Sequence, residues 1–260
     1  MRKILAGFPF LFTAIFLFGQ GQNHYEKGIE FFKKRAEGSS GLQANPLQLN
    51  QAIFHFQKAF PDPAFERDAG VFLLKCAFYK GTFVETDQAK MVAAFEEGKK
   101  LGEYLVGKYP NWAAAQFWYL TCLGKWAECK SGWAAATDGV AEKMKTAAEK
   151  IIENDPGYHD ASAFRVLGML NIKCPYIPFF LPWPDNKEGL KKCEESVNRG
   201  PGNPGNFLSY AEALYENGLP EKAIGVLKRL IGIKPRPDMY LEDKKEIEDG
   251  KKLLEKYLKN

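Results

Sequence analysis

Helical hydrophobic spacing, broken at intervals by proline and glycine, is the feature that most constrains the fold of this chain. After Gln22 the apolar residues recur three or four positions apart, which places them on one face of an α-helix. Alternating apolar and polar runs, the pattern of a half-buried β-strand, are essentially absent. The breaks fall at Pro61–Pro63, Pro110, Pro156, Gly200–Gly205 and Pro235–Pro237. Each stretch between breaks can hold two helices, so the sequence predicts an all-α protein built of helix pairs.

The last complete stretch indicates how the two helices of a pair fit together. Its residues take the landmark positions of a repeat of about 34 residues. These are Tyr210, Ala211, Leu214, Gly218, Ala223, Leu227, Leu230 and Pro235. Ala211 and Ala223 are small where the two helices approach, and Gly218 supplies the turn between them. Pro235 ends the second helix. This spacing is that of the tetratricopeptide repeat.

Four earlier stretches repeat the arrangement less regularly, from 25 to 59, 65 to 109, 112 to 152 and 164 to 201. A final segment, Leu241–Leu258, has Ile247, Leu254 and Leu258 on one face and charged residues elsewhere. That pattern is typical of a helix that caps the end of a stack. We therefore expect residues 22–260 to form a right-handed helical solenoid of about five helix pairs plus a C-terminal capping helix.

The N-terminal segment has the parts of a secretory signal peptide, residues 1–21. Met1-Arg2-Lys3 is positive, Ile4–Phe18 carries no charge, and Gly19-Gln20-Gly21 offers small residues for cleavage. The alternative is a retained anchor, but crossing a bilayer takes about 20 apolar residues, and this run is shorter and contains Gly7 and Pro9. We expect an exported protein of the periplasm or cell envelope, with no transmembrane span in the mature chain.

Charge balance and motifs weigh against several classes of function. Lys and Arg number 36 against 32 Asp and Glu, and so small an excess gives no electrostatic footprint for nucleic acid. The three histidines stand in no zinc motif, so the sequence predicts no metal site and no cofactor. Gly200–Gly205 fits G-x-G-x-x-G, but Pro201 and Pro204 remove donor N–H groups, which favours a turn between repeats. With no nucleophile motif in the chain, we expect no catalytic residues and no enzymatic activity.

The five cysteines include no C-x-x-C pair. Cys174 and Cys193 lie on the two helices of one expected pair and could meet as a disulfide. We expect all five to be small buried apolar residues instead, because a chain of this length does not need covalent cross-links to fold. Whether Cys174 and Cys193 pair stays open at this point.

Residues 174–184 form an unusual insert with four prolines and six large apolar side chains. Proline prevents a helix here, and full exposure would leave a large apolar patch. Two interpretations remain open: the insert packs over the solenoid as a lid, or it binds a partner or an apolar small ligand. In the second case Phe179, Phe180 and Trp183 are the expected anchors.

The order of landmarks resembles that of the tetratricopeptide-repeat periplasmic T-component family, which is associated with TRAP-type (tripartite) solute transporters. The matching segments are Gln116–Leu120 with Leu123–Trp126, Asn154–Tyr158, Arg165–Gly168, Pro175–Phe179 and Ala211–Leu214. The resemblance implies an exported binding or scaffold protein that assembles as a trimer and cooperates with an extracytoplasmic solute receptor.

The resemblance also implies where a partner would bind. In this family the first helix of each pair lines a concave groove and contacts ligands from fixed repeat positions. In the two most regular units those positions hold Ser162, Arg165, Met169 and Lys173, then Leu208, Glu212, Tyr215 and Glu216. Two functions are therefore open: the accessory component of a TRAP-type solute uptake system, or a generic envelope adaptor that binds a protein or peptide in its groove.

Overall fold

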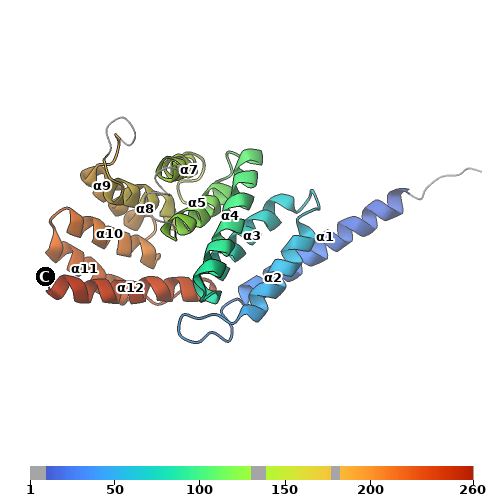
Figure 1. Ribbon diagram of the computed structural model, residues 1–260, viewed down its shortest axis with the longest axis horizontal. Helices are drawn as coiled ribbons and strands as arrows, with labels where there is room; N and C mark the ends of the chain where they lie inside the picture. Colours follow the sequence, from blue (N-terminus) through green and yellow to red (C-terminus); the bar gives the residue numbers. More distant parts are fainter. Residues whose placement is uncertain (1–9, 130–138, 177–181, 260) are drawn as a thin grey trace, which may run out of the picture.

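The computed structural model describes residues 10–129, 139–176 and 182–259, and the described part is helical without a named strand. The first three pairs are α1 (Phe10–Lys33) with α2 (Pro46–Ala59), α3 (Glu66–Tyr79) with α4 (Gln88–Lys108), and α5 (Ala113–Glu128) with α7 (Val140–Asn154). The last two are α8 (Tyr158–Lys173) with α9 (Asn186–Arg199), and α10 (Pro204–Glu216) with α11 (Pro220–Ile231). A π-helical turn, η1 (Lys80–Val84), follows α3, and a short 3-10 turn, η2 (Pro237–Met239), precedes α12 (Tyr240–Lys259). The expected five pairs and closing helix are confirmed, and Figure 1 shows them stacked side by side.

The helix ends follow from local side-chain chemistry. Asn45, Asp87, Asp185 and Asn203 each precede a helix and accept a hydrogen bond from a backbone N–H of its first turn. Gly218 has φ +73°, a left-handed conformation that lets α10 end and α11 begin two residues later. The predicted turn lies between α9 and α10 at residues 200–203, and Pro204 and Gly205 already belong to the first turn of α10.

Close packing within a pair depends on small residues where the two helices approach each other. A Cβ atom added to Gly168 of α8 would lie 2.4 Å from the Cys193 sulfur and 2.8 Å from the Gly189 oxygen, both on α9. Ala211 and Ala223 are likewise fully buried between α10 and α11. All five cysteines are free thiols; Cys76, Cys122 and Cys193 are buried, and Cys129 and Cys174 are half-buried. Cys174 and Cys193 therefore do not pair in this structure.

The closing helix does more than cap the stack. Its later turns pack on the last pair, where Ile247 is buried and Tyr257 stacks on Tyr215 of α10 with ring centroids 3.7 Å apart. Its first turn reaches the opposite end of the molecule, where Leu241 is 0% exposed in the core of the first two pairs. Figure 1 shows α12, in red, lying across the pairs from one end toward the other.

One predicted contact of the closing helix is wrong. Leu258 is 61% exposed, and the neighbouring Tyr257 takes the buried position instead. The other two residues of the predicted face keep their place: Ile247 is buried in the last core cluster and Leu254 packs against it.

The first helix runs from Phe10 to Lys33, so one continuous helix includes the end of the apolar N-terminal run and the start of the predicted stretch from 25 to 59. Figure 1 shows its first turns extending away from the other helices. None of the described helices has the length and apolar character that crossing a membrane requires.

The start of α8 departs from helical geometry. His159, Asp160 and Ala161 have φ values of 50°, 55° and 56°, which are left-handed. An L-residue other than glycine costs about 1–2 kcal/mol in this conformation. Three in succession must be held by their surroundings, and they lie where two hollows of the molecule meet.

Candidate functional site

The first helices of the pairs form one face of the solenoid, and the segment Pro235–Asp243, which we call the strap, lies over it. Under the strap is a hollow of about 420 Å³ that extends from α1 to α8, and a second of about 140 Å³ adjoins it toward α10. Trp118, His159, Arg236, Met239 and Glu242 line both. We call the two hollows together the inner site.

Two arginines attach the strap to the pairs. Arg35, at the end of α1, is 5% exposed and donates to Glu242 Oε1 from Nη2 at 2.8 Å and from Nε at 3.2 Å. It also donates to the backbone oxygens of Phe32 and Asp238. Arg236, in the strap, pairs with Asp160 of α8 and with Asp243 of α12. Most of these contacts join residues far apart in sequence, and together they hold the strap on the inner face.

Two other cations of the inner site have no acidic partner. In the described ranges, no carboxylate lies within ion-pair distance of Lys75 or Arg165. The Lys75 ammonium lies instead over two aromatic rings, 4.5 Å from the centroid of Phe72 and 5.6 Å from that of Trp118. Burial, and then the nearby Arg35 charge, lower the pKa of Lys75. Carboxylates also line the two hollows, among them Asp238 and Glu246, but none of them forms an ion pair with Lys75 or Arg165.

His159 lines both hollows with these cations. Its ring stacks on Phe117 at 4.4 Å and meets Trp118 edge-on at 5.4 Å, and its Nδ1 is 3.3 Å from the Ser162 hydroxyl oxygen. Burial is the main reason that the pKa of His159 falls to about 3, and Arg165, Arg236 and Lys75 lower it further while Asp160 opposes them. The imidazole is therefore neutral at neutral pH, and the potential around it is positive.

Glu242 supplies the one clear unsatisfied acceptor of the inner site. Its Oε1 binds Arg35, whereas its Oε2 is buried with no hydrogen-bond partner among the described residues. Burial raises the pKa of this carboxyl group despite the Arg35 charge. A buried acceptor without a partner is rare, and a bound solute or water that donates to it would remove that penalty.

The predicted groove residues divide between the inner site and contacts elsewhere. Arg165 lines the smaller hollow. Lys173 and Glu212 form an ion pair of 2.7 Å between α8 and α10, and Tyr215 stacks on Tyr257. Met169 is half-buried and lines neither hollow. Of these five residues, only Arg165 therefore faces the inner site.

The remaining groove positions also lie outside the two hollows. Ser162 is buried and binds the His159 backbone oxygen, Leu208 packs against the last core cluster, and Glu216 is exposed at the end of α10.

In the insert, Trp183 packs toward the solenoid. Its indole nitrogen donates to Glu142 Oε2 at 2.9 Å, and the Lys145 ammonium lies 5.7 Å from its ring centroid, both on α7. Phe179 and Phe180 lie outside the described residues, so the choice between lid and binding surface stays a prediction for them.

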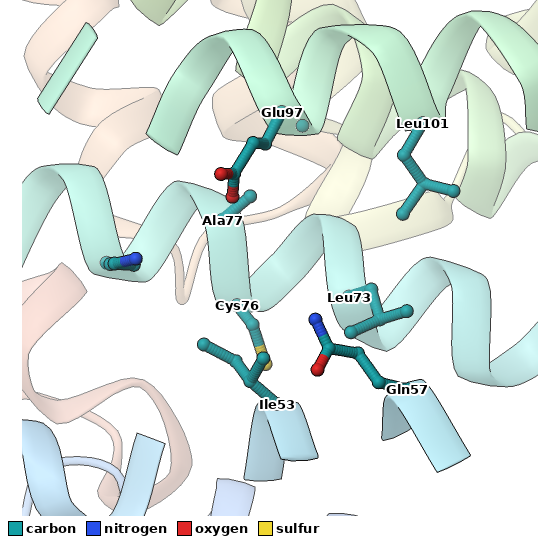
Figure 2. A pocket seen from close by; sticks show the side chains of 9 residues that line it. Ile53, Gln57, Leu73, Cys76, Ala77, Glu97 and Leu101 are labelled. Carbon is teal, nitrogen blue, oxygen red and sulfur yellow. The ribbon is translucent and has the colours of Figure 1, made fainter. Parts of the chain in front are cut away.

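A further hollow of about 440 Å³ lies between α2, α3 and α4. Figure 2 shows Ile53 and Gln57 of α2 opposite Leu73 and Cys76 of α3, with Glu97 and Leu101 on α4. Its lining mixes apolar residues with Gln57, Lys80 and Glu97, and burial raises the pKa of the Cys76 thiol far above its usual range, so that thiol is inert. The inner site is the better candidate because it holds two cations without an ion pair among the described residues.

Several residues of the inner site were missed by the sequence analysis. Lys75 interrupts the apolar run Val71–Tyr79, and that lone charge was a usable signal. Arg236 was noted only as part of a proline-rich helix stop, and Glu242 and Asp243 only as the polar back of a helix. Their positions depend on contacts across the whole chain, which spacing does not encode.

Comparisons with known proteins add little to the geometry. No protein-family model matches the chain, and no curated protein matches it significantly. Among solved structures, the chain is similar to the TPR2AB domain of yeast Sti1 in a complex with pHSP90, at 11% identity and a TM-score of 0.36. That match covers 92% of this chain and 98% of the other.

The described helices and their spacing define the class themselves: the protein is an all-helical solenoid of tetratricopeptide type. Nothing in the described part groups three or more His, Cys, Asp or Glu side chains in a way that could hold a metal ion.

Proposed function

We propose that the protein is an exported, non-catalytic binding protein that takes a small anionic solute into the inner site, as the periplasmic accessory component of a TRAP-type uptake system. The observation that carries the proposal is that Lys75 and Arg165, two cations without an ion pair among the described residues, lie with a neutral His159 in adjoining hollows. An anion that displaces water from the site would stabilise the charges of these two side chains.

The size of the site and the position of the strap favour a small solute over a peptide. Hollows of about 300–1,000 Å³ are typical of small-molecule sites, and the larger one here is about 420 Å³. An extended peptide would need the length of the inner face, but the strap crosses that face from Arg35 to Asp160. This argues against the alternative of a generic envelope adaptor with a peptide in its groove.

The walls indicate what else the solute carries. Phe117, Trp118 and Met239 offer apolar surface beside the cations, and Glu242 Oε2 offers an acceptor. An organic anion with an apolar or flat portion and one donor group would satisfy all of these groups together.

The protonation states support binding rather than catalysis. A general base works best when its pKa lies near the working pH, and the pKa of His159 is about 3. Lys75 and the arginines act as fixed charges. The proposal therefore gives the inner site a recognition role.

Export and the transport role are tested in the native organism. Sequencing the N-terminus of the protein from the envelope fraction should find cleavage after Gly21, and genes for a solute receptor and a permease should lie beside this one. Retention of Met1 in a membrane fraction would contradict export, and the absence of both neighbouring genes would contradict the transport role.

Solute binding is tested on protein purified from its own cells. Denaturing it should release a small anion in stoichiometric amount, identified by mass spectrometry. Lys75→Met should release none, whereas Lys90→Met, a change of an exposed helix lysine, should release the wild-type amount. Equal release from Lys75→Met would reject the inner site. Co-purification of a solute receptor, and the mass of any homo-oligomer, would be measured on the same material.

A further inference from the structure

The strap and the left-handed start of α8 meet at one ion pair. We propose that Arg236 is the positioning residue that builds the inner site: by bridging Asp243 and Asp160 it holds His159–Ala161 in the left-handed conformation that turns the His159 ring into the hollow. This inference rests on the proposed function only in taking the inner site as the binding site.

Arg236 is itself held firmly on the strap. Its backbone N–H and its Nε both donate to Asp243 Oδ2, at 2.9 and 2.8 Å, and its Nη2 donates to Asp243 Oδ1 at 2.7 Å. Asp243, in the first turn of α12, is 2% exposed. The guanidinium is thus oriented before it reaches α8, and its Nη1 remains to bind Asp160 Oδ2 at 2.5 Å.

The left-handed turn is held at several other points. Asn206, fully buried at the start of α10, donates from Nδ2 to the backbone oxygens of Asp160, Ser196 and Gly200. The Ser162 hydroxyl donates to the His159 oxygen at 2.6 Å. These hydrogen bonds involve uncharged side chains, one on α10 of the adjoining pair and one on α8 itself. Among the described residues, Arg236 is the charged side chain that extends from the strap and binds this turn, through the carboxylate of Asp160.

The proposal gives this turn a second conformation, adopted when Arg236 is removed. Residues after Ala161 continue as ordinary right-handed helix to Lys173. Without Arg236, His159–Ala161 would lose strain by joining that helix, and the His159 ring would leave its place against Phe117. Closure of the strap and assembly of the site are then one event, so a solute bound at His159 also holds the strap closed.

The test compares Arg236→Gln with Lys234→Gln, an exposed residue two positions earlier, in the purified full chain without solute. Nuclear magnetic resonance follows two signals. The backbone chemical shifts of Ala161 report the sign of its φ angle. The Ala161 signals are assigned as those that disappear in Ala161→Gly. The imidazole titration reports His159, which is one of three histidines and is assigned with His24→Gln and His55→Gln.

In the wild type, Ala161 should show left-handed shifts and the pKa of His159 should be about 3. In Arg236→Gln, Ala161 should shift to right-handed helical values, and the pKa of His159 should move toward the ordinary value of about 6.5. Lys234→Gln should match the wild type. Wild-type Ala161 shifts in Arg236→Gln would overturn the proposal, whether or not a solute is ever found.

A second substitution distinguishes two explanations for a changed His159 pKa in Arg236→Gln: a change in the turn conformation, or only the loss of a positive charge near the ring. Glycine adopts the left-handed conformation without strain, so adding Ala161→Gly to Arg236→Gln should return the His159 pKa part of the way to the wild-type value. No return would overturn the proposal. If Arg236→Gln does not fold, Arg236→Lys keeps the charge but not the bridge. Ala161 should then show intermediate shifts, and wild-type shifts would again reject the positioning role.

Discussion

Lys75 lies on a face of α3 that is otherwise apolar, and its ammonium group is stabilised by aromatic rings rather than by a carboxylate. Burial and the Arg35 charge lower its pKa, which means that the folded state pays a free-energy penalty to keep this lysine charged. A residue that destabilises the fold and faces a hollow is typical of a binding site.

We expect Lys75→Met to raise the free energy of unfolding by about 1–2 kcal/mol, because the apolar stem is kept and a buried, unpaired charge is removed. Urea denaturation measures the change. Lys90→Met, at an exposed position, should change stability by less than about 0.5 kcal/mol. A loss of stability in Lys75→Met would mean that the ammonium group has a structural partner.

His159 should make stability depend on pH. Its pKa is near 6.5 in the unfolded chain and about 3 in the folded one. As pH falls below 6.5, the unfolded chain takes up a proton that the folded chain cannot, so this contribution to stability is present above the unfolded pKa and is lost on acidification.

The wild type should therefore lose about 2 kcal/mol more than His159→Asn between pH 7 and pH 5. Asparagine suits the comparison because it tolerates left-handed backbone. Denaturant titrations of both proteins at the two pH values give the difference, and parallel pH dependence would contradict the burial of a neutral imidazole.

At the level of elements, the helix pairs could be predicted because each depends on local signals. Asn203 followed by Pro204 marks the start of α10, and Gly218 marks its end. The start of α8 could not be predicted in the same way. Its left-handed residues are fixed by Asn206 and Arg236, 46 and 76 positions away, and nothing within the segment itself requires that conformation.

Glycine substitutions test that conformation directly. Ala161→Gly should be neutral or stabilising, because glycine removes about 1 kcal/mol of left-handed strain. Ala163→Gly, two residues on in the regular part of α8 and equally buried, should cost about 1 kcal/mol or more. Thermal denaturation measures both, and equal losses would mean that the start of α8 is ordinary helix.

At the level of the whole molecule, a solenoid usually has contacts only between neighbouring repeats. Here α12 connects the last pair to the first, since Leu241 is buried with residues of the first two pairs and Lys244 donates to the Gly41 oxygen. Such a connection should make the two ends of the molecule unfold together.

Leu241→Ala tests this connection. We expect a loss of about 2–4 kcal/mol and a separation of the unfolding of the first pairs from that of the rest. Hydrogen exchange resolves the two ends. Leu258→Ala, on the same helix and 61% exposed, is the matched control and should change stability by less than about 0.5 kcal/mol. Uniform exchange in Leu241→Ala would show that the ends are not coupled through α12.

The central claim is that the inner site recognises negative charge, and solute titrations followed by thermal denaturation test it most directly. Benzoate and succinate are compared with benzamide and succinamide, which have nearly the same shape without the charge. A carboxylate that binds should stabilise the wild type by about 2.7 kcal/mol at 100 times its Kd, its amide should have no effect, and Lys75→Met should abolish the response. Equal stabilisation by acid and amide, or an unchanged response in Lys75→Met, would contradict the account.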